Sequence, residues 1–213
     1  MTGPLPLGFS TNALALFLGA SVALVLTPGP DTMYVLTRGV ADGRAAGLQS
    51  ALGVSTGILV HTTAAVLGLA ALLRVSELGY ALVKYVGAAY LLYLGVQTIR
   101  QDDALSSADS SADGGSFRQG VAVNVLNPKV ALFFLAFLPQ FVTAKSAASL
   151  QMVALGLLYA VLTVAYLGTV GVLSGRIGTA LRRRDRVRSA IQWGSGTVLA
   201  GLAVRLAVGD SLG

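Results

Sequence analysis

Long apolar runs alternate with short polar loops along the whole chain. They lie near residues 12–36, 45–73, 78–99, 118–142, 149–173 and 190–208. An α-helix rises about 1.5 Å per residue, so roughly 20 apolar residues cross a hydrocarbon core about 30 Å thick. The last run contains Gly194, Gly196 and Gly201 and is the weakest prediction, which leaves five or six crossings. The pattern predicts an all-α, polytopic membrane protein with six transmembrane helices.

The first and fourth runs share a short pattern around a proline. The first reads VLTPGPDTMYVL and the fourth VLNPKVALFFLAFLPQF, so Leu-polar-Pro recurs at Pro28 and Pro128. A polar stretch rich in small residues, predicted as a flexible linker at 101–117, divides the chain into repeats at about 10–100 and 118–209. Because each repeat holds three runs, an odd number, the second enters the membrane from the opposite side.

We therefore predict a single membrane transporter domain over 1–213, built as two inverted three-helix repeats with broken first helices. Inverted repeats with discontinuous helices are typical of secondary transporters, because a broken helix frees backbone groups to face a substrate or ion. The alternative is structural, since proline is common in transmembrane helices whose neighbours satisfy the freed carbonyl. Two prolines at matching positions favour the functional interpretation over the structural one.

Composition supports the membrane assignment and narrows the chemistry. The chain is 54% hydrophobic and 11% charged, whereas an ordinary soluble domain carries roughly 25% charged residues. It has no cysteine and one histidine, His61, which argues against thiolate or histidine metal centres. No HExxH or similar catalytic motif is present. We expect no cofactor, no metal site and no catalytic residues.

The basic residues lie between the apolar runs and predict the topology. Arg38 and Arg44 flank the first loop, Arg100 and Arg118 flank the third, and RRRDRVR at 182–188 occupies the fifth. The positive-inside rule places these loops in the cytoplasm and both termini outside if six runs cross. The N-terminus lacks the basic region of a signal peptide, so the first run is expected to stay in the mature protein. Nucleic-acid binding is not expected.

Two charged residues lie deep inside predicted helices. Asp31 is the first candidate for proton coupling, because an ionisable group in the membrane costs several kcal/mol unless it is paired or solvated. The alternative is that it complements the dipole of the helix that starts after Pro30. Lys129 lies about eleven residues from either end of its run, too deep to reach the headgroups easily. A pseudo-twofold axis would bring both charges to the centre, either as a pair or holding the two ends of a zwitterion.

Three uncharged polar positions accompany these charges. His61 lies in the middle of its run and is a second candidate for proton coupling, the alternative being a hydrogen-bonded packing role. Asn124 and Asn127 are three residues apart on one helix, so both can face the same cavity. Hydrogen bonding between helices is the alternative for this pair.

The segments TPGPDTMYVLTRGVADGRAAGLQSALGVSTG (27–57) and VLNPKVALFFLAFLPQFV (125–142) resemble the LysE/RhtB family of amino-acid exporters. The resemblance implies export of amino acids or close derivatives across the cytoplasmic membrane of a bacterium. It also implies coupling to the proton gradient and frequent assembly as a homodimer. The family motif residues in this chain are Pro28, Gly29, Pro30, Arg38, Gly39, Gly47, Gly53, Gly57, Asn127, Pro128 and Lys129.

The expected function is a secondary active exporter, an antiporter that exchanges small zwitterions for protons across a lipid bilayer. The predicted substrate and ion pathway consists of Thr27, Pro28, Gly29, Pro30, Asp31, Asn124, Asn127, Pro128 and Lys129, with Asp31 and His61 as the proton-coupling candidates. One alternative is a cation or metal exporter, although such a site favours more histidine, cysteine or carboxylate ligands than this chain offers. Others are an intramembrane enzyme and a membrane sensor that transports nothing.

Overall fold

The computed structural model describes residues 6–75, 77–100, 115–142, 147–183 and 185–208. All regular structure within these residues is helical, which confirms the all-α prediction. The elements are η1 (Pro6–Gly8), α1 (Thr11–Leu26), α2 (Pro30–Ala41), α3 (Arg44–Val75), α4 (Glu77–Arg100), α5 (Ser116–Val125), α6 (Pro128–Leu132), η2 (Phe133–Phe137), η3 (Leu138–Phe141), α7 (Ala148–Arg183) and α8 (Asp185–Val208). Most of the predicted linker lies outside the described residues, and α5 begins at Ser116, so the linker prediction ends too late.

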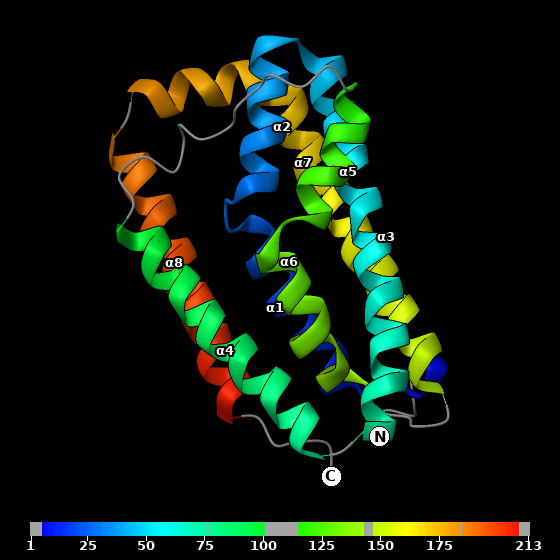
Figure 1. Ribbon diagram of the computed structural model, residues 1–213. Helices are drawn as coiled ribbons and strands as arrows, with labels where there is room; N and C mark the ends of the chain where they lie inside the picture. The colour runs from blue at the N-terminus through cyan, green and yellow to red at the C-terminus, as the bar shows by residue number, and fades with distance from the viewer. Residues whose placement is uncertain (1–5, 76, 101–114, 143–146, 184, 209–213) are drawn as a thin grey trace.

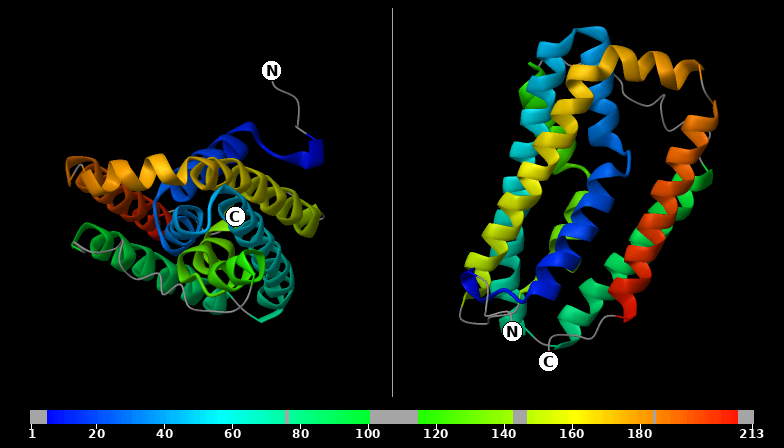
Figure 2. Two further views of the ribbon diagram at one scale, coloured as in Figure 1. Left: turned by 90° about the horizontal axis from the view of Figure 1, so that it is seen from above. Right: turned by 180° about the vertical axis from the view of Figure 1, so that it is seen from behind.

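Two broken helices lie between two groups of unbroken ones. On one side α4 packs along α8, and on the other α3 packs along α7 and also contacts α5, the first half of one broken helix (Figure 1). The view from behind shows the same arrangement (Figure 2). The broken helix α1–α2 and the broken helix α5–α6 therefore occupy the middle of the molecule, where the predicted site residues lie.

Each broken helix bends where its proline lies. The axes of α1 and α2 differ by 48°, and α5 and the helix that starts at Pro128 differ by 50°. Proline supplies no N–H for the carbonyl four residues earlier, so the helical ladder stops at Leu26 and at Val125. The two broken helices run in opposite directions (Figure 1). The predicted breaks at Pro28 and Pro128 are present.

The helices of the structure that are long and apolar enough to cross a membrane are fewer than the six spans predicted from the sequence. Among the described residues, Arg44–Gly68 in α3 and Ala148–Gly178 in α7 are each long and apolar enough to cross a membrane. Each bent pair passes the same test when taken as one unit, which gives two to four spans. In α8 the described apolar stretch is shorter, Gly196–Val208. Helices cover all six predicted runs, but six crossings stay a prediction.

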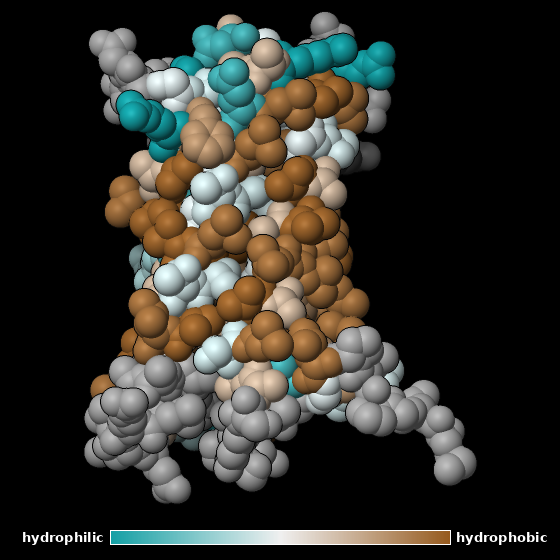
Figure 3. Space-filling model, turned by 90° about the vertical axis from the view of Figure 1, so that its right-hand side faces the viewer, coloured by the Kyte–Doolittle hydropathy of each residue, from teal (hydrophilic) through white to brown (hydrophobic). Residues whose placement is uncertain are grey.

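One end of the molecule is hydrophilic, and the described residues below it on the face shown are mainly apolar. Figure 3 shows hydrophilic residues at the end where α2 finishes and α3 and α5 begin, above an apolar body. The turn from α2 to α3 uses Gly43 at φ 86°, a left-handed conformation that glycine adopts without strain. Arg38 pairs with Asp42 at 2.9 Å just before this turn. The side chains of the 182–188 cluster lie outside the described residues.

Hydrogen bonds join α2 to the start of α5 at this hydrophilic end. The Tyr34 hydroxyl donates to the Ser116 carbonyl at 2.8 Å. The Arg38 guanidinium donates to the Ser116 hydroxyl through Nε at 3.3 Å and through its NH2 nitrogen at 3.0 Å. We call this group, Tyr34, Arg38 and Ser116, the polar clasp. It holds together the two half-helices that lie between the breaks and the hydrophilic end.

Aromatic side chains fill the interior on the other side of the breaks. The rings of Phe17, Phe133, Phe134, Phe137, Phe141 and Tyr159 stack with centroids 5.1–6.2 Å apart, and each side chain is nearly fully buried. We call this group the aromatic cluster. Four of its members come from η2 and η3, where the backbone passes through a π-helix and then a 3₁₀-helix. Pro139 contributes to this irregularity because it offers no N–H to the carbonyl of Leu135.

Candidate functional site

The carbonyls that the first break frees are bound by a lysine from the second. Lys129 Nζ donates to the Thr27 carbonyl at 2.8 Å and to the Leu24 carbonyl at 3.3 Å. The helical partner of Leu24 would be the N–H of residue 28, which is proline. Lys129 is 8% exposed, so its ammonium group occupies the negative end of the α1 dipole in a buried position.

A histidine binds the carbonyl that the second break frees. The helical partner of the Asn124 carbonyl would be the N–H of residue 128, again proline. This oxygen accepts instead from the backbone N–H of Asn127 at 2.9 Å, and His61 Nε2 lies 3.0 Å from it as a second partner. Because a carbonyl oxygen only accepts, we assign the proton to Nε2. This hydrogen bond is the kind that the packing alternative for His61 predicts, and proton coupling through His61 stays a prediction.

A direct hydrogen bond connects the two breaks. Asn124 Nδ2 donates to Asp31 Oδ2 at 2.9 Å, and Asn124 is fully buried. Asp31 lies in the first turn of α2, where a carboxylate complements the helix dipole. The amide has room because α3 carries glycine at position 57: a Cβ there would lie 2.7 Å from Asn124 Oδ1. Gly57 thus positions Asn124, and Asn124 positions the carboxylate.

Several buried polar atoms at the breaks have no protein partner. They are Asp31 Oδ1, Asn124 Oδ1 and Asn127 Nδ2. Buried polar groups are usually hydrogen-bonded, so three such atoms close together in the chain fold indicate a functional rather than a purely structural region. The other end of the Asn127 amide is used, because its Oδ1 accepts from the Lys129 backbone N–H at 3.0 Å and caps α6.

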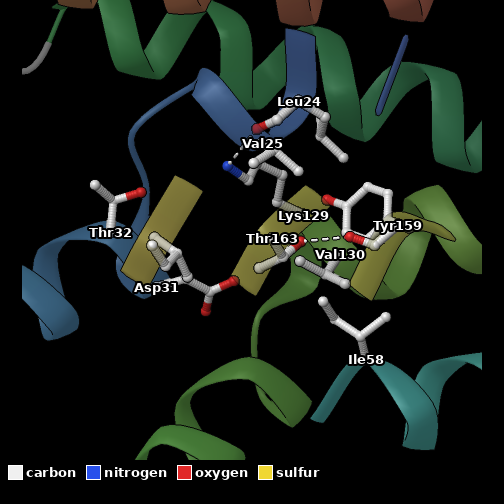
Figure 4. A pocket seen from close by; sticks show the side chains of 10 residues that line it. Leu24, Val25, Asp31, Thr32, Ile58, Lys129, Val130, Tyr159 and Thr163 are labelled. Carbon is white, nitrogen blue, oxygen red and sulfur yellow. Dashed lines mark hydrogen bonds between the residues drawn. The ribbon is translucent and has the colours of Figure 1, made fainter. Parts of the chain in front are cut away.

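Asp31 and Lys129 line one small cavity between the broken helices and α7 (Figure 4). The cavity has a volume of about 20 Å³, enough for one water molecule. Its walls are Leu24, Val25, Asp31, Thr32, Ile58, Lys129, Val130, Tyr159, Thr163 and Leu167. No salt bridge joins Asp31 to Lys129, so these two side chains do not pair directly.

Only some of the predicted pathway residues line the cavity. Asp31 and Lys129 line the cavity, whereas the predicted pathway prolines, glycine, asparagines and Thr27 do not. Sequence reasoning missed Tyr159 and Thr163 of α7, which the cavity includes. The Thr163 hydroxyl donates to the Tyr159 carbonyl at 2.9 Å. A signal was present, because two polar side chains four residues apart in an apolar run share one helix face.

A metal site finds no support in the side chains. No group of three or more histidine, cysteine, aspartate or glutamate residues is placed to hold a metal ion within the part of the chain that the structure describes. The charged groups of the cavity are one carboxylate and one ammonium. This pair of opposite charges suits an organic zwitterion better than a metal cation, because Lys129 would repel the cation.

Comparison with known proteins yields one family and several relatives. The model of a family described as LysE type translocator matches residues 22–210. The chain is 32% identical over 195 residues to an uncharacterized membrane protein of Pseudomonas aeruginosa, covering 87% of this chain and 90% of that protein. It is 31% identical over 202 residues to the leucine efflux protein of Klebsiella pneumoniae, covering 92% and 94%. A membrane protein of Bacillus subtilis is 33% identical over 165 residues, 72% of this chain and 79% of that protein. No solved structure matches.

Proposed function

The chain belongs to the LysE type translocator family, and from this premise we propose that it is a secondary active exporter of amino acids or closely related small zwitterionic metabolites. The family consists of transporters, and the related proteins are membrane proteins. We therefore interpret the site as part of a membrane translocator. We place it in the cytoplasmic membrane of a bacterium, with the arginine-bearing loops on the cytoplasmic side.

We further propose six crossings arranged as two inverted three-helix repeats. The opposite directions of the two broken helices support this arrangement, as do their nearly equal bends of 48° and 50°. The bonding supports it too, since the carbonyls of Leu24 and Asn124, each four residues before its proline, both accept a side-chain donor. Matching chemistry at matching positions is what a duplicated unit predicts.

One observation carries the choice of substrate: Asp31 and Lys129 face the same cavity without pairing, and each has bonding capacity left. Asp31 Oδ1 has no partner, whereas Oδ2 accepts from Asn124. Lys129 uses two of its three N–H groups on the Thr27 and Leu24 carbonyls. A zwitterion between them would place its carboxylate at the third N–H of Lys129 and its ammonium at Asp31 Oδ1.

Competition for one carboxylate gives a simple route to proton exchange. When Asp31 is ionised it attracts the substrate ammonium; when it binds a proton the attraction is lost and the substrate is released. A proton and a substrate then use the same group in turn, which is the requirement for antiport. His61 contacts Asn124, the residue that bonds Asp31, and this proximity supports it as the second proton-coupling candidate.

Export from cells expressing the chain tests the proposal. A mixed pool of amino acids is loaded, and its efflux is followed with and without a protonophore. We expect selective efflux that the protonophore abolishes. The variants Asp31→Asn and Lys129→Met, checked for membrane expression, should each abolish it. Undiminished efflux in both variants would reject the zwitterion site, and efflux that ignores the protonophore would reject proton coupling.

A further inference from the structure

We infer that the site selects zwitterions whose side chain carries no charge. This inference rests on the proposed function and narrows it to a substrate class. The cavity wall includes one acidic and one basic residue among its ten members. An α-amino acid uses both, the acid for its ammonium group and the base for its carboxylate.

A charged substrate side chain would have no partner left in this wall. Lysine would bring a second ammonium and glutamate a second carboxylate, and Asp31 and Lys129 are already committed to the α-groups. The other titratable side chain of the wall is the Tyr159 phenol, which is uncharged at neutral pH, and His61 does not line the cavity and has its Nε2 bound to the Asn124 carbonyl. An unpaired charge in a buried site costs several kcal/mol, so at least about a tenfold loss of affinity follows for either amino acid.

The rest of the wall matches an apolar or hydroxyl-bearing side chain. Leu24 and Val25 come from α1, Val130 from α6, and Ile58 and Leu167 from the unbroken helices α3 and α7. Contact between these aliphatic groups and an aliphatic substrate side chain is favourable because it buries apolar surface. A charged side chain would lose its hydration there without gaining a hydrogen bond or an ion pair. Hydroxyl groups of Thr32, Tyr159 and Thr163 lie in the same wall and accommodate a small neutral polar group.

The cavity must enlarge before a substrate enters, because about 20 Å³ holds only one water molecule. Opening separates the helices that form the wall, and both charged groups lie next to a proline break, where such movement is easiest. The movement changes distances within the wall, and these ten residues still supply a single carboxylate and a single ammonium. We therefore expect the same preference for substrates with uncharged side chains when the cavity is open.

Counterflow in proteoliposomes containing the purified full chain tests the inference. Vesicles are loaded with unlabelled amino acid and the entry of radiolabelled leucine is measured. We expect internal valine or threonine to drive entry at least about ten times more effectively than internal lysine or glutamate. If lysine or glutamate drives entry as well as valine, the inference is wrong while the proposed function survives. If no amino acid drives entry, both fail.

A gain of function provides a sharper test. Val25 is half-buried and lines the cavity, so Val25→Asp adds a second carboxylate, and Val25→Asn is its matched uncharged control. We expect the ratio of lysine to leucine transport to be about ten times higher in the aspartate variant than in the asparagine variant. If the Val25 variants do not reach the membrane, the same comparison is made at Thr163 of α7, with Thr163→Asp as the charged variant and Thr163→Asn as its control. Equal ratios in the aspartate and asparagine variants of both pairs would overturn the inference.

Discussion

Lys129 donates to the carbonyl of Leu24, the acceptor that Pro28 leaves without a helical partner. The first break is thus completed by a side chain from the second broken helix. At the second break His61 fills the equivalent position on the carbonyl of Asn124. Each proline removes the helical donor from one of these carbonyls, and in both cases a side chain of another helix binds it, although the Asn124 carbonyl also accepts from the Asn127 N–H at 2.9 Å. The breaks are stable because their freed backbone groups are bound, and each depends on its neighbours to remain so.

Removal of the lysine donor should destabilise the protein as well as stop transport. Lys129→Met leaves the Leu24 and Thr27 carbonyls buried without a donor, at a cost of about 1–3 kcal/mol each. We expect a clear fall in the melting temperature of the detergent-solubilised protein. Lys129→Arg keeps a positive donor and should lose less. A methionine variant as stable as the parent would show that the two hydrogen bonds contribute nothing.

Restoration of the missing N–H should straighten the first broken helix. Pro28→Ala returns a helical donor to Leu24 and competes with Lys129 for that carbonyl. We expect normal membrane insertion with export reduced at least about tenfold. The control is Pro30→Ala, because Pro30 starts α2, where a backbone N–H has no helical partner. Equal losses in the two variants would contradict a specific role for the bend at Pro28.

Space at Gly57 should be essential for the position of the carboxylate. A Cβ at this position lies 2.7 Å from Asn124 Oδ1, so Gly57→Ala pushes the amide away from Asp31. We expect a loss of exchange comparable to that of Asn124→Ala. Gly68→Ala on the same helix is the control, since its Cβ meets Leu135 at an ordinary 3.9 Å. Full activity of Gly57→Ala would mean that the Asn124 amide need not be held where it is.

The polar clasp should control access to the cavity from the hydrophilic end. The chain has no cysteine, so Thr163→Cys introduces a single reporter in the cavity wall. Tyr34→Phe removes the 2.8 Å bond to Ser116 and should increase the labelling of this cysteine in inside-out vesicles several-fold. Tyr93→Phe alters an exposed tyrosine of α4 and should have no effect. Unchanged labelling in Tyr34→Phe would show that the clasp does not limit entry.

Much of the framework could be predicted from the sequence, because prolines and buried charges are unusual in apolar helices. The two breaks follow from the prolines, and a common cavity for Asp31 and Lys129 follows from the matched positions next to them. The partners of Lys129 could not be predicted in this way, since backbone carbonyls are the same in every residue. Tyr159 and Thr163 were missed because α7 is apolar on most of its circumference, so the four-residue spacing of this pair was a short signal for its inward face.

The polar clasp and the aromatic cluster differ in the free energy needed to separate their members. The polar clasp can exchange its hydrogen bonds for bonds to water at a net cost of about 1 kcal/mol each. Separation of the rings in the aromatic cluster exposes apolar surface at about 25 cal/mol per Å², and water offers nothing in return. We therefore expect thermal fluctuations at rest to admit solvent mainly from the arginine-bearing end. In the proposed topology, the end with the lower barrier to opening faces the cytoplasm, from which an exporter takes its substrate.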